Sequence, residues 1–319
     1  MISNSVQLIT SILLLRSRQI WILQTSLVGA ILSTMHLMGG LGFFFGGFNR
    51  TSQYYNYRTA RGIANLLLLS VACLIIPTVS TVFQVGNNPI TDEASTARGI
   101  LHLSRGTSVI LLFMYAAFLF FSLKTHTSVF NAPSPQSQQR ARMKLFAAEY
   151  NLHEEGLILV RRNGPESLAE PPPEQKEVEN KEKGEAKQVR PSKWQALLVM
   201  IITTVILAFN LKFATDSLEG LMQDAGLGKT FIGMILLPLL GNDITPLVAA
   251  WNDNMNLCIS TTLGKCLQSS IVIIPIIIVL GWIMGIDQMS LDFDRFEVVL
   301  LFVSMISIIS IVGYGESNW

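Results

Sequence analysis

Long apolar runs alternate with short polar ones along most of this chain. A helix needs roughly 17–25 apolar residues to cross the hydrocarbon core of a bilayer. Seven runs are full candidates for such helices, at about residues 20–45, 63–83, 107–123, 194–213, 230–251, 259–286 and 298–312. An eighth, residues 6–15, is too short to span alone. The pattern therefore predicts an all-α polytopic membrane protein with about seven to eight transmembrane segments.

One stretch interrupts this pattern. Residues 131–193 are rich in Pro, Gln, Glu and Lys, and from Glu174 to Arg190 charges alternate with almost no apolar content. Such segments cannot bury enough apolar surface to fold. We expect an N-terminal half at 1–123, a charged and disordered linker at 124–193, and a C-terminal half at 194–319. A regulatory loop that contacts the helical halves is the alternative for the linker.

Composition supports the membrane assignment. Hydrophobic residues make up 50% of the chain, charged residues only 14%, and the mean hydropathy is +0.44. The net charge of +1 gives no reason to expect nucleic acid as a partner. Cys73, Cys258 and Cys266 have no paired spacing, which argues against a disulfide framework or a zinc site. Basic residues gather on the side of the linker, which predicts that this side is cytosolic, although Arg16 and Arg18 lie opposite.

An acidic residue, Asp243, lies inside the apolar run at 230–251. A charge at bilayer depth is costly, so it usually faces a water-filled path or a partner and marks an ion or proton site. Gly241 and Pro246 flank it, which predicts that the helix breaks there, as helices do at the binding sites of secondary transporters. An Asp that only caps the broken helix is the alternative. Ion transport is therefore the first hypothesis.

The two halves also echo one another. The segment at 27–32 follows Ser3-Asn4 by about 25 residues, and the segment at 262–267 follows Gly241-Asn242 at a similar distance. Weak internal repeats of this kind are typical of transporters built from two inverted halves. No phosphate-binding loop or Ser/His/Asp constellation appears in the sequence, so we do not expect an enzyme.

Several stretches together resemble the calcium/proton exchangers of the cation/calcium exchanger superfamily, in their fungal vacuolar branch. They are residues 24–33, 43–47, 216–221, 231–242, 274–275, 280–287, 291–297 and the closing Gly315-Glu316-Ser317-Asn318-Trp319. The resemblance covers nearly all of the chain except the linker. It implies two inverted-topology helical repeats joined by a cytosolic linker.

In that family each repeat supplies a Gly-Asn-x-x-Glu segment at the membrane midplane. The two glutamates, with nearby Asn, Ser and backbone oxygens, bind Ca2+ and protons alternately. Ca2+ takes several oxygen ligands with carboxylates among them, and a carboxylate in low dielectric protonates more readily. The resemblance implies Ca2+/H+ antiport by alternating access in the vacuolar membrane or another endomembrane. It implies the lipid bilayer, Ca2+ and H+ as partners, and no cofactor beyond the transported ions.

The chain departs from the family at this chemistry. Residues 3–7 occupy the first Gly-Asn-x-x-Glu place, where Gln7 offers a carbonyl oxygen but no charge, and no Asp or Glu precedes Asp92. In the second repeat, direct counting puts Thr245 in the glutamate's place, and a deletion would put Asp243 there instead. Asp243 is the candidate carboxylate for Ca2+. The candidate cation ligands, or their relics, are Asn4, Gln7, Ser33, Asn242, Asp243 and Gln268.

Lys265 is the second departure, in a segment where the family places small hydroxyl residues near the ion. It could pair with Asp243 or act as a tethered cation, and either arrangement would block the site by repelling Ca2+. Snorkelling toward the interface is the alternative. The chain begins inside the first motif and stops at the Ser-Asn-Trp signature, so we expect it to lack family helices at both ends.

These departures leave two other hypotheses open beside antiport. The first is a transport-incompetent homologue, either a partner or regulator of an intact exchanger subunit or a truncated non-functional paralogue. The second is transport of another ion through a neutral or single-carboxylate site.

Overall fold

The structure is a computed structural model. It describes residues 4–48, 52–87, 93–125, 193–217, 220, 226, 228–313 and 316–318. The chain divides into two compact units, one made of Met1–Gln136 and Leu207–Trp319 and the other of Ser137–Ile206. The predicted linker at 124–193 lies almost entirely outside the described residues, so its disorder and the boundaries of the two halves stay predictions.

The N-terminal part of the first unit is a series of helices. They are α1 (Ser5–Arg16), α2 (Ile20–Leu32), the π-helical segment η2 (Ser33–Met38), α3 (Gly39–Gly47), α4 (Tyr57–Asn87), α5 (Glu93–Phe120) and a second π-helical segment, η3 (Phe121–Thr125). Helix α1 has 12 residues, as its short apolar run predicts. The tight turn after it contains Arg18 at a φ of 59°.

The second half consists of shorter pieces. They are α9 (Lys193–Asp216), α11 (Lys229–Phe231), η4 (Ile232–Leu236), α12 (Leu237–Gly241), α13 (Thr245–Trp251), α14 (Met255–Gln268), η5 (Ser269–Ile273), α15 (Ile274–Ile283) and α16 (Arg295–Val312). Helix α9 falls partly in the second unit and agrees in length with the predicted span at 194–213. Segments η4 and η5 are π-helical, like η2.

Five helices of the described residues are long and apolar enough to cross a membrane. They cover Ile20–Gly47, Tyr57–Thr81, Ala97–Phe120, Met255–Ile283 and Arg295–Val312. The apolar run at 230–251 is not one helix, because the backbone of Asn242 is extended, with φ −76° and ψ 141°. Hydropathy alone cannot show such a break, whereas the flanking glycine and proline predict it.

Two short strands accompany the helices. Strand β1 (Ser52–Tyr54) pairs antiparallel with β2 (Glu316–Asn318), with Ser52 opposite Asn318. Next to this pair, the hydroxyl of Tyr55 donates a hydrogen bond to the carbonyl of Ile311 at 3.2 Å. The strand pair therefore joins the end of α16 to the segment between α3 and α4. The fold is otherwise all-α, as predicted.

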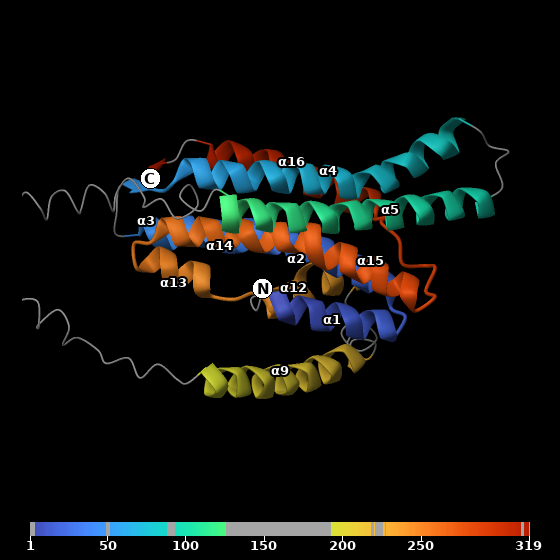
Figure 1. Cartoon of the computed structure of the whole chain (residues 1–319), viewed down its shortest axis with the longest axis horizontal. Coiled ribbons are helices and arrows are strands. Elements are labelled where there is room, and N and C mark those ends of the chain that lie inside the picture. Colours follow the sequence, from blue (N-terminus) through green and yellow to red (C-terminus); the bar gives the residue numbers. More distant parts are fainter. Residues whose placement is uncertain are drawn as a thin grey trace, which may run out of the picture. The chain divides into compact units, whose positions relative to one another are not determined.

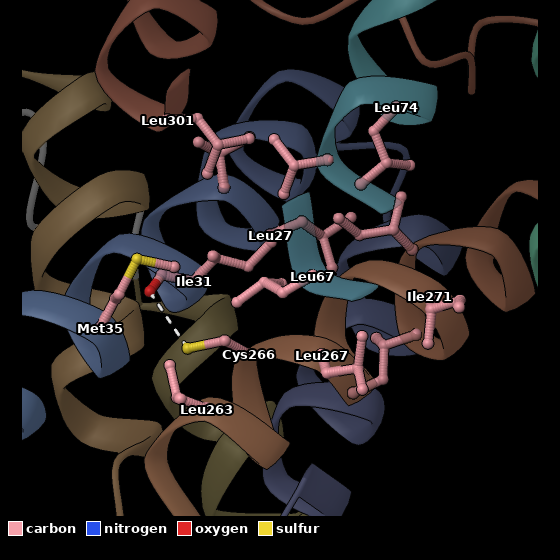
Figure 2. Close-up of a cluster of buried hydrophobic side chains, with 14 of the residues drawn as sticks. Leu27, Ile31, Met35, Leu67, Leu74, Leu263, Cys266, Leu267, Ile271 and Leu301 are labelled. Atoms are coloured by element: carbon pink, nitrogen blue, oxygen red, sulfur yellow. Dashed lines mark hydrogen bonds between the residues drawn. The ribbon is translucent and has the colours of Figure 1, made fainter. Parts of the chain in front are cut away.

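The core of the first unit lies where helices of the two halves cross. Figure 1 shows α4, α5 and α14 running along one another, and α2 packs against both α14 and η4. Figure 2 shows the buried side chains that α2, α4, α14 and α16 contribute, among them Leu27, Leu67, Leu263 and Leu301. Helices pack closely in lipid where small residues let backbones approach. Gly29 is such a residue, since a Cβ there would overlap the Met234 backbone.

Candidate functional site

The site is built on the break between α12 and α13. Pro246 lies in the first turn of α13, where a proline costs no hydrogen bond, while Pro238 follows directly on η4 within a continuous helical run. Oδ1 of Asp243 accepts a hydrogen bond from the backbone N–H of Thr245 at 3.0 Å. Asp243, one residue before the N-cap Ile244, therefore binds the first turn of α13, in keeping with the capping alternative considered for it.

The second role, pairing with a cation, is present as well. The Nζ atom of Lys265 on α14 lies 2.8 Å from Oδ2 of Asp243. The side chain of Lys265 is only 7% exposed, while that of Asp243 keeps 31%. Lys265 therefore does not snorkel to the surface; its ammonium group is buried, where a charge needs an ionic partner.

Two asparagines connect the halves across this break. Asn242 donates from Nδ2 to Oγ of Ser33 at 2.6 Å and accepts at Oδ1 from Oγ1 of Thr34 at 3.1 Å. Asn4, just before α1, donates from Nδ2 to Oε1 of Gln268 and to the backbone carbonyl of Lys265, both at 3.2 Å. An asparagine of each half thus contacts the other half close to a π-helical segment. Asn242 contacts the start of η2, and Asn4 contacts Gln268, the residue just before η5.

Gln7 lies beside the second of these contacts. Its Oε1 accepts a hydrogen bond from Oγ of Ser269 at 2.6 Å. Its Nε2 is buried and has no hydrogen-bond partner among the described residues. Asn4, Gln7 and Asn242 together line a cavity of about 30 Å3. A cavity of that volume holds about one or two waters. A water or another small polar species can therefore bind there, next to the unsatisfied Nε2 donor of Gln7.

The charges around the break cancel. Asp243 and Lys265 neutralise one another, and the other groups of the network that the structure describes are amides and hydroxyls. A divalent cation prefers sites with ionised carboxylates. It can reach Asp243 here only in competition with the ammonium group of Lys265.

All six candidate ligands gather in this network, although their role as cation ligands stays a prediction. Sequence reasoning did not single out Ser269, the partner of Gln7. The internal repeat could have identified Ser269. When the two halves are aligned with Leu27 at Thr262, Thr34 aligns with Ser269 and Ser33 with Gln268.

Comparison with known proteins agrees with this architecture. The sequence model of the family described as "Sodium/calcium exchanger protein" matches residues 1–124 and 195–319. The vacuolar calcium ion transporter of Schizosaccharomyces pombe is 26% identical over 319 residues, which is 99% of this chain and 65% of that protein. Vacuolar cation/proton exchanger 2 of Arabidopsis thaliana is 29% identical over 321 residues, which is 99% of this chain and 62% of that protein. The chain thus spans less than two thirds of these relatives.

Solved structures share the fold. The structure of native YfkE matches with a TM-score of 0.69 and 22% sequence identity, over 99% of this chain and 75% of that one. The selenium-substituted Ca2+/H+ antiporter protein YfkE matches with a TM-score of 0.68 over 99% of this chain and 76% of that one, also at 22% identity. At this identity the likeness concerns the fold alone.

Proposed function

Because the chain belongs to the sodium/calcium exchanger protein family, we propose that it exchanges Ca2+ for protons across a membrane, with the broken helix at Asp243 as its binding site. The observation that carries the proposal is the crossed network in which Asn4 meets Gln268 and Asn242 meets Ser33. It brings oxygen-bearing side chains of both halves around a single carboxylate. Relatives named as vacuolar calcium transporters and cation/proton exchangers support the same activity and the vacuolar membrane as its location.

The geometry suggests how one carboxylate serves two ions. Asp243 bonds to the ammonium group of Lys265 when no cation is bound. Ca2+ displaces that ammonium group and takes Asp243, with the amide oxygens of Asn242, Gln268 and Gln7 as further ligands. Protonation of Asp243 removes the charge and releases the metal, which couples the two fluxes. The halves alternate their exposure around the break, and no cofactor is proposed beyond the transported ions.

The test is calcium uptake driven by a proton gradient, in sealed lipid vesicles that contain only this chain. We expect uptake in the wild type and its loss in Asp243→Asn. The double variant Asp243→Asn with Lys265→Met is the second arm, because it removes the carboxylate without leaving a buried charge unpaired. Asp287→Asn is the matched control, since Asp287 is a 77% exposed surface carboxylate that pairs with Arg105.

The ion pair also favours a second candidate. Within the described residues, Asp243 is the one carboxylate at the break, and the chain's own Lys265 holds it. This arrangement suits a transport-incompetent homologue that binds an intact exchanger subunit. In that case correctly inserted wild type shows no uptake. Lys265→Ser then separates the causes: restored uptake identifies the lysine as the block, and continued inactivity excludes autonomous antiport by this chain.

A further inference from the structure

Away from the broken helix, a second and larger cavity opens beside the first turn of α16. It has a volume of about 450 Å3, and a water molecule occupies about 30 Å3 in the liquid, so the cavity holds many waters. Its polar lining comes from α2, α4, the loop before α16 and the first turn of α16, and consists of Gln24, Thr25, Thr78, Thr81, Asp292, Asp294, Arg295 and Glu297. None of these residues belongs to the proposed cation site.

Glu297 is the unusual member of this lining. Its side chain is only 2% exposed, and it is the one buried carboxylate among the residues that the structure describes. Neither of its carboxylate oxygens has a hydrogen-bond partner within that part of the chain. The hydroxyl of Thr25 lies nearby without completing a hydrogen bond of good geometry. An ionised carboxylate in this position would be desolvated and uncompensated, which proteins avoid by neutralising the group.

No fixed cation compensates Glu297 from the elements packed against it. Helices α2 and α4 face the cavity with neutral side chains, such as Thr25 and Thr78. The loop contributes Asp292 and Asp294, which carry like charge, and Asp294 already caps α16 by accepting from the N–H of Phe296 at 2.8 Å. Arg295 is two residues from Glu297 on the same helix, a spacing at which side chains do not face each other.

A divalent cation fits this cavity poorly. No cluster of three or more His, Cys, Asp or Glu side chains able to hold a metal occurs among the described residues. A proton needs only one carboxyl group with water close by. The oxygens of Glu297 are themselves buried, and the residue lines this cavity, so its water lies next to the carboxyl group.

We propose that Glu297 is a proton-binding carboxyl group that exchanges its proton with the water of this cavity. A hydronium ion in the cavity gives its proton to Glu297, and release returns the proton to water. Proton binding by Glu297 stands independently of transport. Only its use as a proton source or acceptor for exchange rests on the function proposed above.

The experiment is infrared spectroscopy of the full chain in lipid at neutral pH. We expect a carboxylic acid C=O band that shifts on transfer to D2O, because the acidic proton exchanges with cavity water. The band should disappear in Glu297→Gln and persist in Asp292→Asn and Asp243→Asn. A spectrum in which Glu297→Gln removes only a carboxylate band shows that Glu297 is ionised, and overturns the proposal.

A second measurement decides the matter if Glu297→Gln fails to fold. An apolar carbodiimide modifies a carboxyl group in its protonated form, by taking up the acidic proton and binding the carboxyl oxygen. We expect peptide mass spectrometry of the treated wild type to find Glu297 modified at neutral pH and Asp287 unmodified. Modification of Glu297 only in the denatured chain at acid pH overturns the proposal. Neither readout depends on calcium uptake, so failure of transport and failure of proton binding are distinguishable.

Discussion

The two ends of the site differ in chemistry although their geometry is alike. At one end Asn4 and Gln7 of the first half meet Gln268 and Ser269 through neutral hydrogen bonds. At the other end Asn242 of the second half meets Ser33 through the same kind of bond. The carboxylate of the ion pair, Asp243, directly follows Asn242 at this second end, whereas Asn4 at the first end contacts the backbone carbonyl of Lys265 and not its charge.

The difference separates two tasks that a pair of family glutamates would perform together. The amides and hydroxyls hold the halves against each other, and this task requires no charge. Selection of a cation does require charge, and only Asp243 supplies it at the break in the described structure. A chain can therefore keep the frame of an exchanger while its electrostatics change, and each variant below acts on one of these tasks.

The largest effect is expected from Asp243→Asn, which leaves the 7% exposed Lys265 without its counter-charge. Breaking a buried ion pair on one side costs about 3–5 kcal/mol. The lower end, about 3 kcal/mol, applies because Asp243 itself is 31% exposed. Denaturant unfolding in detergent measures the loss, and adding Lys265→Met should recover most of it. Equal stability of the single variant and the wild type would contradict a charged pair.

The next effect concerns the neutral hydrogen bonds that hold the two halves together. Asn242→Ala removes a donor to Ser33 and an acceptor for Thr34, and leaves both hydroxyls without these bonds. We expect a loss of about 1–3 kcal/mol in the free energy of unfolding. Asn4→Ala should lose a similar amount, because Asn4 also makes two hydrogen bonds across the halves. A loss at only one of the two positions would show that the ends are not equivalent supports.

A smaller gain is expected from restoring charge to the neutral end. Gln7→Glu places a carboxylate beside the 2.6 Å contact with Ser269, and Ca2+ favours added carboxylate ligands. We expect calcium affinity to rise about tenfold, which corresponds to about 1.4 kcal/mol. Titration calorimetry measures this affinity, with Gln19→Glu as a control of the same charge away from the network. Equal changes in the two variants would indicate a general effect of net charge.

The smallest effect is expected at a surface ion pair. Arg105 lies 2.8 Å from Asp287, which is 77% exposed, and pairs of this kind contribute at most about 1 kcal/mol. Asp287→Asn should therefore change the free energy of unfolding by less than that, since Arg105 also keeps its position 5.2 Å over the ring of Trp282. A loss as large as that of Asp243→Asn would remove the contrast between buried and exposed pairs.

Much of this frame could be predicted from the sequence. Apolar run lengths predicted the long helices, and Gly241 with Pro246 predicted the break between α12 and α13. These features depend on local backbone preferences and on hydropathy, which a single sequence contains. The family was identified because its motifs are long and remain intact outside the ion site.

The charges of the site could be predicted only as alternatives. Capping by Asp243 and pairing with Lys265 were separate possibilities, and the structure contains both because the two carboxylate oxygens face different partners. That outcome depends on how α14 packs against the break. Glu297 shows the same limit, since its sequence position at a helix start does not reveal that the side chain is buried beside a cavity.

Three of the π-helical segments, η2, η4 and η5, have a mechanical consequence. Each lies in or beside the helices that cross at the break and holds more residues per turn than an α-helix. If such a π-helical turn changed to α-helical winding, the part of the helix beyond it would rotate by about 100°, which is the rotation of one α-helical residue. A change from π- to α-helical winding at Ser33 or Ser269 would therefore re-aim the side chains that follow it on the same helix.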